Sequence, residues 1–181
     1  MAVLEIVEVP DPRLRLVSRP VESVDDGVRK LIDDMVDTMY AAHGIGLAAI
    51  QVGVDRRVLV IDLQEEEDAE GKPVKNPRAF VNPEILSSEG ASTSTEGCLS
   101  FPGLEIDVKR AEKVRVTYLD DYGVRRERDA DGLFAICIQH EIDHLDGIVF
   151  VDRLGPVSRR LAQREFDKLR AKAAAEAVSE R

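Results

Sequence analysis

The sequence predicts an α+β domain in which antiparallel or mixed β-sheets surround a central helix, with a further helix toward each end of the chain. Two observations support this fold class. Strand-like segments follow one another without alternating helices, and one strongly apolar helix, expected over 132–145, lies among them. We expect residues 1–172 to form a single domain and residues 173–181 to be a frayed tail.

The first helix is expected over 28–42, because its apolar residues recur at the i, i+3, i+4 and i+7 spacing of one helix face. A last helix should open at Gly155-Pro156. The acidic stretch 64–78 is expected to be an exposed loop, and we assign it no function. Runs rich in Val, Leu and Ile predict strands at 57–63, 79–86, 104–108, 113–119, 124–128 and 148–151.

Charge and hydropathy exclude several classes of protein. A net charge of −10 argues against DNA binding by the surface as a whole. No apolar run approaches the roughly 20 residues of a membrane span, and the N-terminus does not resemble a signal peptide, so we expect a cytoplasmic protein. The segment 156–172 is a basic exception. Its charged residues are Arg159, Arg160, Arg164, Lys168, Arg170 and Lys172, against Glu165 and Asp167.

The sharpest local motif is His140-Glu141-Ile142-Asp143-His144. Residues four apart lie above one another on a helix, so both imidazoles can bind one metal ion. Glu141 is offset by about 100° and can reach a water on that ion. The preceding residues are apolar, which indicates a buried helix, and buried histidines need partners. The motif therefore predicts a metal site.

A catalytic metal usually takes three protein ligands and keeps one position open. His43 stands alone at a helix end, and no distinctive ligand follows His144. Cys137 shares the helix face but lies a turn away from the point between the two imidazoles. Cys98, flanked by glycine between strands, can approach from across the site. On the residues alone we favour Cys98 over Cys137, and a small buried apolar role remains open for either.

Three segments together resemble the signature motifs of the peptide deformylase family, in that family's order. They are Gly44-Ile45-Gly46-Leu47-Ala48-Ala49-Ile50-Gln51, Glu96-Gly97-Cys98-Leu99-Ser100 and Gln139-His140-Glu141-Ile142-Asp143-His144-Leu145-Asp146-Gly147. The likeness covers most of the chain and leaves the acidic loop and the C-terminal tail outside it. It implies a metal-dependent hydrolase that removes the N-formyl group from the formyl-methionine of new polypeptides and releases formate.

The resemblance also implies roles for individual residues. Cys98, His140 and His144 would bind one divalent metal, usually Fe(II) in the family, although Zn(II), Ni(II) or Co(II) can take its place. Glu141 would be the general base when metal-bound water attacks the formyl carbon. The side chain of Gln51 and the N–H of Leu99 would form the oxyanion hole.

Substrate-binding residues are implied in the same way. Gly44 and Gly46 would let an extended peptide approach the backbone, although they also suit the end of a helix. The methionine pocket would be lined by Ile45, Leu133, Ile136 and Cys137, residues that would otherwise be read as core.

Two rival functions stay open at this point. An HExxH metallopeptidase would usually place its third ligand downstream, whereas Cys98 lies upstream of the helix. A catalytically silent, metal-stabilised ribosome-binding protein would need neither Glu141 nor Gln51. The basic 156–172 segment suggests docking on ribosomal RNA as a hypothesis, beside the simpler alternative of a solvated helix face.

Overall fold

The computed structural model describes residues 2–72 and 74–179. Three short 3₁₀ helices lie at Pro12–Arg15, Ala49–Val52 and Phe150–Arg153. The main elements, in chain order, are α1 (Asp26–Ala41), β1 (Gly46–Ala48), β2 (Val58–Ile61), β3 (Arg78–Glu89), β4 (Ser92–Gly97), β5 (Glu105–Arg110), β6 (Lys113–Leu119), β7 (Arg125–Asp131), α2 (Gly132–Leu145) and α3 (Pro156–Ser179).

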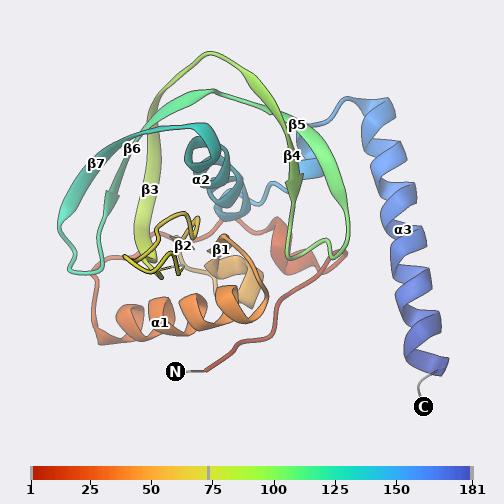
Figure 1. The fold of residues 1–181 in the computed structure, drawn as a ribbon, viewed down its shortest axis with the longest axis horizontal. Coiled ribbons are helices and arrows are strands. Elements are labelled where there is room, and N and C mark those ends of the chain that lie inside the picture. Colours follow the sequence, from red (N-terminus) through yellow and green to blue (C-terminus); the bar gives the residue numbers. More distant parts are fainter. Residues whose placement is uncertain (1, 73, 180–181) are drawn as a thin grey trace.

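The strands form two antiparallel sheets, so the predicted α+β class is confirmed. Five strands pair in the order β1-β2-β3-β6-β7, and β4 pairs with β5 alone. In Figure 1 the large sheet arches over α2, which lies between that sheet and the β4–β5 pair. The central helix is thus enclosed by strands, as its apolar sequence requires.

Strand β2 shows why the sheet can carry helices on two sides. All four of its residues are buried, because successive side chains point to opposite faces and both faces are covered. Val58 and Val60 join the apolar cluster that packs against α1. Leu59 and Ile61 join the cluster around α2. A strand covered on both faces reads as a continuous apolar run, and this one does.

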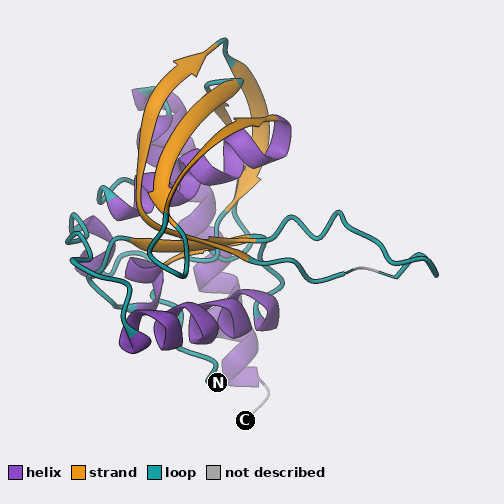
Figure 2. Ribbon diagram, turned by 90° about the vertical axis from the view of Figure 1, so that its left-hand side faces the viewer, coloured by secondary structure: helices purple, strands orange, loops and turns teal. Residues whose placement is uncertain are grey.

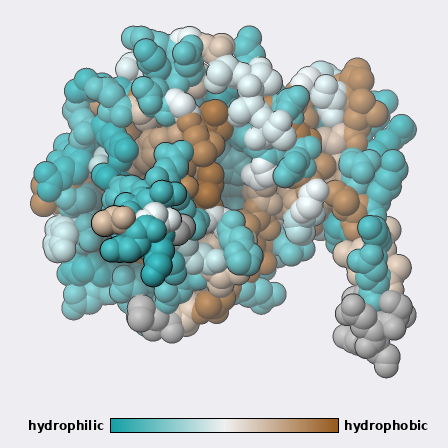
Figure 3. All heavy atoms as spheres, in the orientation of Figure 1, coloured by the Kyte–Doolittle hydropathy of each residue, from teal (hydrophilic) through white to brown (hydrophobic). Residues whose placement is uncertain are grey.

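A third apolar cluster joins the β4–β5 pair to α3. The ring of Phe101 packs against Phe150 and Phe166, with centroids 5.1 and 4.9 Å apart. Beyond this contact α3 runs along one side of the molecule (Figure 1), and its Val157 and Leu161 are exposed. Figure 3 shows hydrophobic surface along the upper part of this helix and in the hollow at the centre of the same face.

The connection between β2 and β3 projects from the body as a long arm (Figure 2), so the exposed acidic loop is confirmed. Its base is fixed at Asp62. The carboxylate of Asp62 accepts hydrogen bonds from the Tyr40 hydroxyl and from the N–H groups of Gln64 and Asn76, both at 2.9 Å.

The N-terminal segment is held by backbone hydrogen bonds to the 3₁₀ helix Ala49–Val52 and to the turn that follows Cys98. Val7 donates its N–H to the carbonyl of Gln51 at 2.7 Å, and Val9 donates to the carbonyl of Ser100 at 3.0 Å. No helix in the described part of the chain is both long and apolar enough to span a membrane.

Some expected elements were missed or wrong. The polar β4 and the short β1 were not predicted. The strand expected at 148–151 was wrong, because Phe150–Arg153 is a 3₁₀ helix whose entry is held by the Asp152 carboxylate accepting the Val149 N–H at 3.0 Å. Helix α3 continues to Ser179, past the point where we expected fraying. The division into residues 1–172 and 173–181 stays a prediction.

Candidate metal centre and active site

Helix α2 presents two histidines on one face, as the motif predicted. His140 and His144 are four residues apart, and their ring centroids are separated by 5.0 Å. Both are buried, at 7% and 1% exposed. Nine of the 14 residues of α2 are buried, so the helix holds these side chains in a fixed frame. Polar rings buried this far need partners within the protein or a bound ion.

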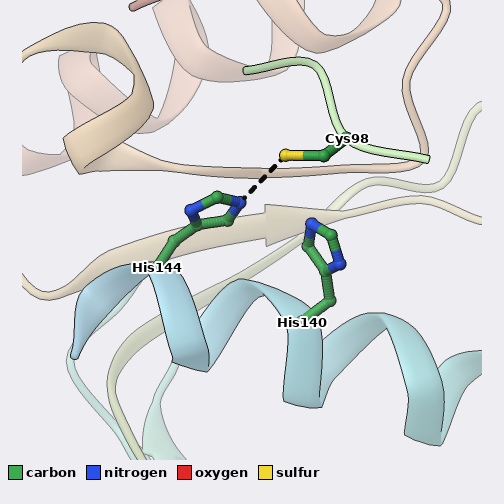
Figure 4. A group of neighbouring side chains, drawn as sticks. All are labelled: Cys98, His140 and His144. Carbon is green, nitrogen blue, oxygen red and sulfur yellow. Dashed lines mark hydrogen bonds between the residues drawn. The ribbon is translucent and has the colours of Figure 1, made fainter. Parts of the chain in front are cut away.

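Cys98 completes the group from another element. It follows β4 directly, and its Sγ lies 3.2 Å from Nε2 of His144 (Figure 4). The three candidate ligand atoms of Cys98, His140 and His144 all lie within 4.8 Å of one another. Cys137 is not part of this group, and burial raises the pKa of its thiol well above the ordinary value. The geometry therefore favours Cys98 over Cys137 as third ligand.

The donor set fits a first-row divalent metal. One thiolate and two imidazoles are suited to iron, zinc, cobalt or nickel. Nδ1 of His144 is buried and has no hydrogen-bond partner among the described residues. Burial, as the largest cause, lowers the pKa of His144, which favours the neutral form that a ligand needs. The three donor atoms lie close enough together to share one ion.

Glu141 lies beside this cluster in a buried position. Burial, as the largest cause, raises its pKa to about 7, and its Oε2 has no partner within the described ranges. The absence of a side chain at Gly46 leaves the space that the Glu141 carboxylate occupies. A Cβ added to Gly46 would lie 2.5 Å from Oε1 of Glu141 and 2.9 Å from Sγ of Cys137. The backbone of β1 thus approaches the carboxylate as closely as glycine allows. A carboxyl group with this pKa can both accept and donate a proton near neutral pH.

The orientation of the Gln51 amide is fixed by its neighbours. Oε1 accepts the N–H of Ala48 at 2.8 Å. Nε2 donates to Oγ of Ser100 at 3.2 Å and approaches Sγ of Cys98 at 3.7 Å. Because the backbone donor occupies the oxygen, the NH₂ group must face the cysteine. The amide therefore offers a donor beside the metal cluster.

A cavity of about 520 Å³ connects these groups. The predicted substrate-binding and oxyanion residues all line it, namely Gly44, Ile45, Gly46, Gln51, Leu99, Leu133, Ile136 and Cys137. It also exposes Cys98, His140 and Glu141, whereas His144 lies behind them. His43, which sequence reasoning set aside, stands at the rim and is not part of the Cys/His cluster.

Two neighbours of the cluster were not predicted. Glu96 accepts a hydrogen bond from Nδ1 of His140 at 2.8 Å, and Arg110 binds the Glu96 carboxylate. Glu96 stands in the same motif as Cys98, which was a signal for it. Nothing in the sequence marked Arg110, because its partners are 14 and 33 positions away.

An α+β fold with a Cys/His/His cluster, a buried glutamate beside it and an open cleft defines the class of mononuclear metal hydrolases. The family model described as polypeptide deformylase matches residues 3–160. A peptide deformylase from Rhizorhabdus wittichii is 54% identical over 171 residues, covering 94% of this chain and 97% of that protein. The chain belongs to the peptide deformylase family.

Solved structures agree with this assignment. A crystal structure of a peptide deformylase from Legionella pneumophila matches with a TM-score of 0.85 and 47% identity, over 96% of this chain and 98% of that one. A Met-Ala-Ser-bound class I type b peptide deformylase from Acinetobacter baumannii matches with a TM-score of 0.76 and 36% identity, over 84% and 99% of the two chains. The protein is therefore a metal-dependent hydrolase of a family that acts on N-formyl peptides.

Proposed function

We propose that this chain removes the N-formyl group from the N-terminal formyl-methionine of newly synthesised polypeptides and releases formate. The observation that carries the proposal is a single cavity holding three kinds of group. It is lined by Cys98 and His140 of the Cys98/His140/His144 cluster, by a buried glutamate with a pKa of about 7, and by a fixed amide donor.

In this proposal Cys98, His140 and His144 bind one divalent ion. Fe(II) is the metal we expect from the family resemblance, and Zn(II), Ni(II) or Co(II) suit the same donors. When bound, the ion supplies the Lewis acidity that makes water nucleophilic near neutral pH. Metal analysis of protein purified without oxygen identifies the ion that is loaded.

The remaining chemistry belongs to the chain's own side chains. Glu141 takes the proton of the water that attacks the formyl carbon, and it delivers a proton to the leaving amine. Negative charge grows on the formyl oxygen during the attack. Nε2 of Gln51 and the N–H of Leu99 are the donors assigned to it, each contributing about 3 kcal/mol by analogy with other oxyanion holes.

The methionine side chain is assigned to the apolar part of the cavity, lined by Ile45, Leu133, Ile136 and Cys137. The main chain of the peptide would lie against Gly44 and Gly46, in the manner of an added strand. A related A. baumannii structure holds Met-Ala-Ser, a peptide that begins with methionine, which supports an N-terminal methionine in the substrate.

Formate release from formyl-Met-Ala tests the function, with metal-loaded protein under anaerobic conditions and with Met-Ala as the matched peptide. We expect metal-dependent formate and an intact Met-Ala bond. Cleavage of that bond would point to the metallopeptidase. A folded, metallated protein that released neither product would point to the silent ribosome-binding protein.

We also propose a cytoplasmic location and contact between α3 and the ribosome. The helix stands at the side of the body (Figure 1), and its basic residues Arg160 and Arg164 are exposed. Binding to ribosomal RNA through such residues must weaken as salt rises. We expect Arg160→Gln/Arg164→Gln protein to keep its activity on short peptides and to bind ribosomes less tightly than the unsubstituted chain. Equal binding by both proteins would remove this role from α3.

A further inference from the structure

A buried ionic group lies next to the metal cluster and is not explained by the proposed reaction. Its members Arg110, Glu96 and Asp143 have side chains only 3%, 5% and 6% exposed. Charges withdrawn from water this far are costly, and well-packed apolar residues of similar volume are often at least as stable. Stability alone is therefore a weak reason for this arrangement, and its contacts with the metal cluster offer another one.

The alternation of side chains along β4 and β5 places Arg110 and Glu96 on the same face. In the β4–β5 register Ser92 pairs with Arg110 and Glu96 pairs with Ile106, so Arg110 and Glu96 project from the same face of the pair. The long arginine side chain reaches along that face. Its Nε and Nη2 both donate to the Glu96 carboxylate, the latter at 2.8 Å. This two-point contact fixes the plane of the carboxylate, which a lysine could not do.

The same carboxylate orients a candidate metal ligand. Oε2 of Glu96 accepts the N–H of Nδ1 of His140 at 2.8 Å. Nη2 of Arg110 also lies 3.5 Å from that nitrogen, but both are donors, so the shorter contact to the carboxylate decides the tautomer. With its proton on Nδ1, His140 has its Nε2 lone pair free for a metal. Carboxylate partners of this kind fix the orientation of metal-binding histidines.

Arg110 also reaches the helix that carries both histidines. Its Nη1 donates to Oδ2 of Asp143 at 2.9 Å, and Asp143 immediately precedes His144. One guanidinium thus ties the segment that ends in Cys98 to the helix that carries His140 and His144. The Cys98 segment and α2 must keep their relative position so that the three candidate ligands can meet.

We propose that Arg110 is a positioning residue for the metal ligands, acting on His140 through Glu96 and holding the Cys98 segment against α2. The inference rests on the proposed metal site and concerns its assembly, since Arg110 touches neither substrate nor metal. Removal of Arg110 leaves Glu96 and Asp143 buried without this partner. The Glu96 carboxylate then loses the contact that keeps it aimed at His140.

The chain offers a matched control in Arg153. Its guanidinium binds the same Asp143, with Nε 3.0 Å from Oδ2, but it makes no contact with Glu96 and is 46% exposed. Arg153→Met therefore removes an arginine from Asp143 and leaves the path through Glu96 to His140 intact. A role confined to neutralising Asp143 would make Arg110 and Arg153 equivalent.

The test is the dissociation constant for Zn(II), measured by chelator competition on metal-free protein, together with the visible absorption spectrum of the Co(II)-loaded protein. Arg110→Met and Glu96→Gln should each weaken Zn(II) binding by about 10- to 100-fold and alter the Co(II) spectrum. Arg153→Met should change the constant by less than about 3-fold. The Arg110→Met/Glu96→Gln double variant should be no weaker than the worse single variant, because both act on one path.

Circular dichroism of each metal-free variant establishes that it is folded. If Arg110→Met does not fold, Glu96→Gln and Arg110→Lys carry the test, and Arg110→Lys should weaken Zn(II) binding because it cannot hold the carboxylate at two points. Wild-type affinity and spectrum in the folded Arg110 variants would overturn the inference, as would equal losses in Arg110→Met and Arg153→Met. Failure of the unsubstituted protein to bind Zn(II) would instead overturn the metal site itself.

Discussion

Helices α2 and α3 differ strongly in how much of each is buried. α2 has 14 residues, and nine of them are buried, including four polar or charged ones at its C-terminal half. α3 has 24 residues, and among its described side chains Ala162 and Phe166 are the buried ones. The shorter helix holds the proposed metal ligands and base in fixed positions. The longer helix is attached by a few apolar contacts and presents charged side chains to solvent.

The contrast predicts that a shape-conserving substitution of the buried glutamate on α2 acts on the proposed reaction with little effect on stability. Glu141→Gln keeps the shape of the side chain and removes the base. We expect kcat/KM for formate release to fall by about 10²- to 10⁴-fold. Metal content and melting temperature should stay near those of the unsubstituted protein. A variant that kept more than a tenth of the activity would show that another group takes the proton.

On α3 the largest expected effect is on stability. Phe166 is fully buried against Phe101, which lies three residues after Cys98. Phe166→Ala should lower the free energy of unfolding by about 3–5 kcal/mol, measured by urea titration. Leu161→Ala is the matched control on the same helix, because Leu161 is 59% exposed, and it should change stability by less than about 0.5 kcal/mol. Equal effects would mean that α3 is not anchored at Phe166.

A smaller effect on activity is expected from the backbone that faces α2. Gly46→Ala places a methyl group 2.5 Å from Oε1 of Glu141, so the carboxylate or the strand must shift. A displacement of this size costs on the order of 10²-fold in kcat/KM. Gly155→Ala, at the start of α3, meets no atom within 4 Å and should leave the rate unchanged. Full activity of Gly46→Ala would show that β1 is not rigid at this point.

The smallest effect should appear at the base of the arm, at Asp62, which does not line the cavity. Burial raises the pKa of Asp62, but hydrogen bonds from Tyr40 and from two N–H groups outweigh it, and the net pKa is lowered. A lowered pKa contributes stability that is present above the unfolded value of about 3.9 and is lost as pH falls through the folded value. Asp62→Asn should therefore lower the free energy of unfolding by about 1 kcal/mol at pH 7. The variant's stability should also depend less on pH below about 4.

Unfolding free energies at several pH values check this prediction. The difference between Asp62→Asn and the unsubstituted protein should shrink as pH falls below about 4. A difference that stayed constant down to pH 2 would show that the hydrogen bonds to Asp62 do not depend on its charge.

Local patterns in the sequence predicted the parts of the site that lie on one element. The spacing of His140 and His144 fixes their common face, and the apolar run before them correctly indicated a buried helix. Cys98 was favoured as their partner, and the structure brings it to 3.2 Å from His144. The roles of these residues in binding metal and substrate stay proposals.

The features that the sequence did not reveal depend mainly on contacts between residues in different elements. The sequence of β4 is Ser-Thr-Ser-Thr-Glu-Gly, which has no apolar alternation. Its strand structure depends on pairing with β5, which the local sequence does not reveal. Arg110 looks like an ordinary surface residue until the β4–β5 register places it beside Glu96 and under α2. Residues 148–151 look like a strand from composition, but the 3₁₀ helix Phe150–Arg153 begins within them, and the Asp152 carboxylate holds its entry by accepting the Val149 N–H.

The N-terminal segment has a consequence for the order in which the molecule is built. Val7 and Val9 form their hydrogen bonds with the backbone of Gln51, which lines the cavity, and of Ser100, whose neighbours Leu99 and Phe101 line it. The bond to Ser100 closes a loop of about 90 residues, and such distant contacts form late because of their entropic cost. On a chain that emerges from its N-terminus, this segment stays without its second partner until residue 100 has been made. The hydrogen bond between Val9 and Ser100 is therefore expected to form as one of the last steps of folding.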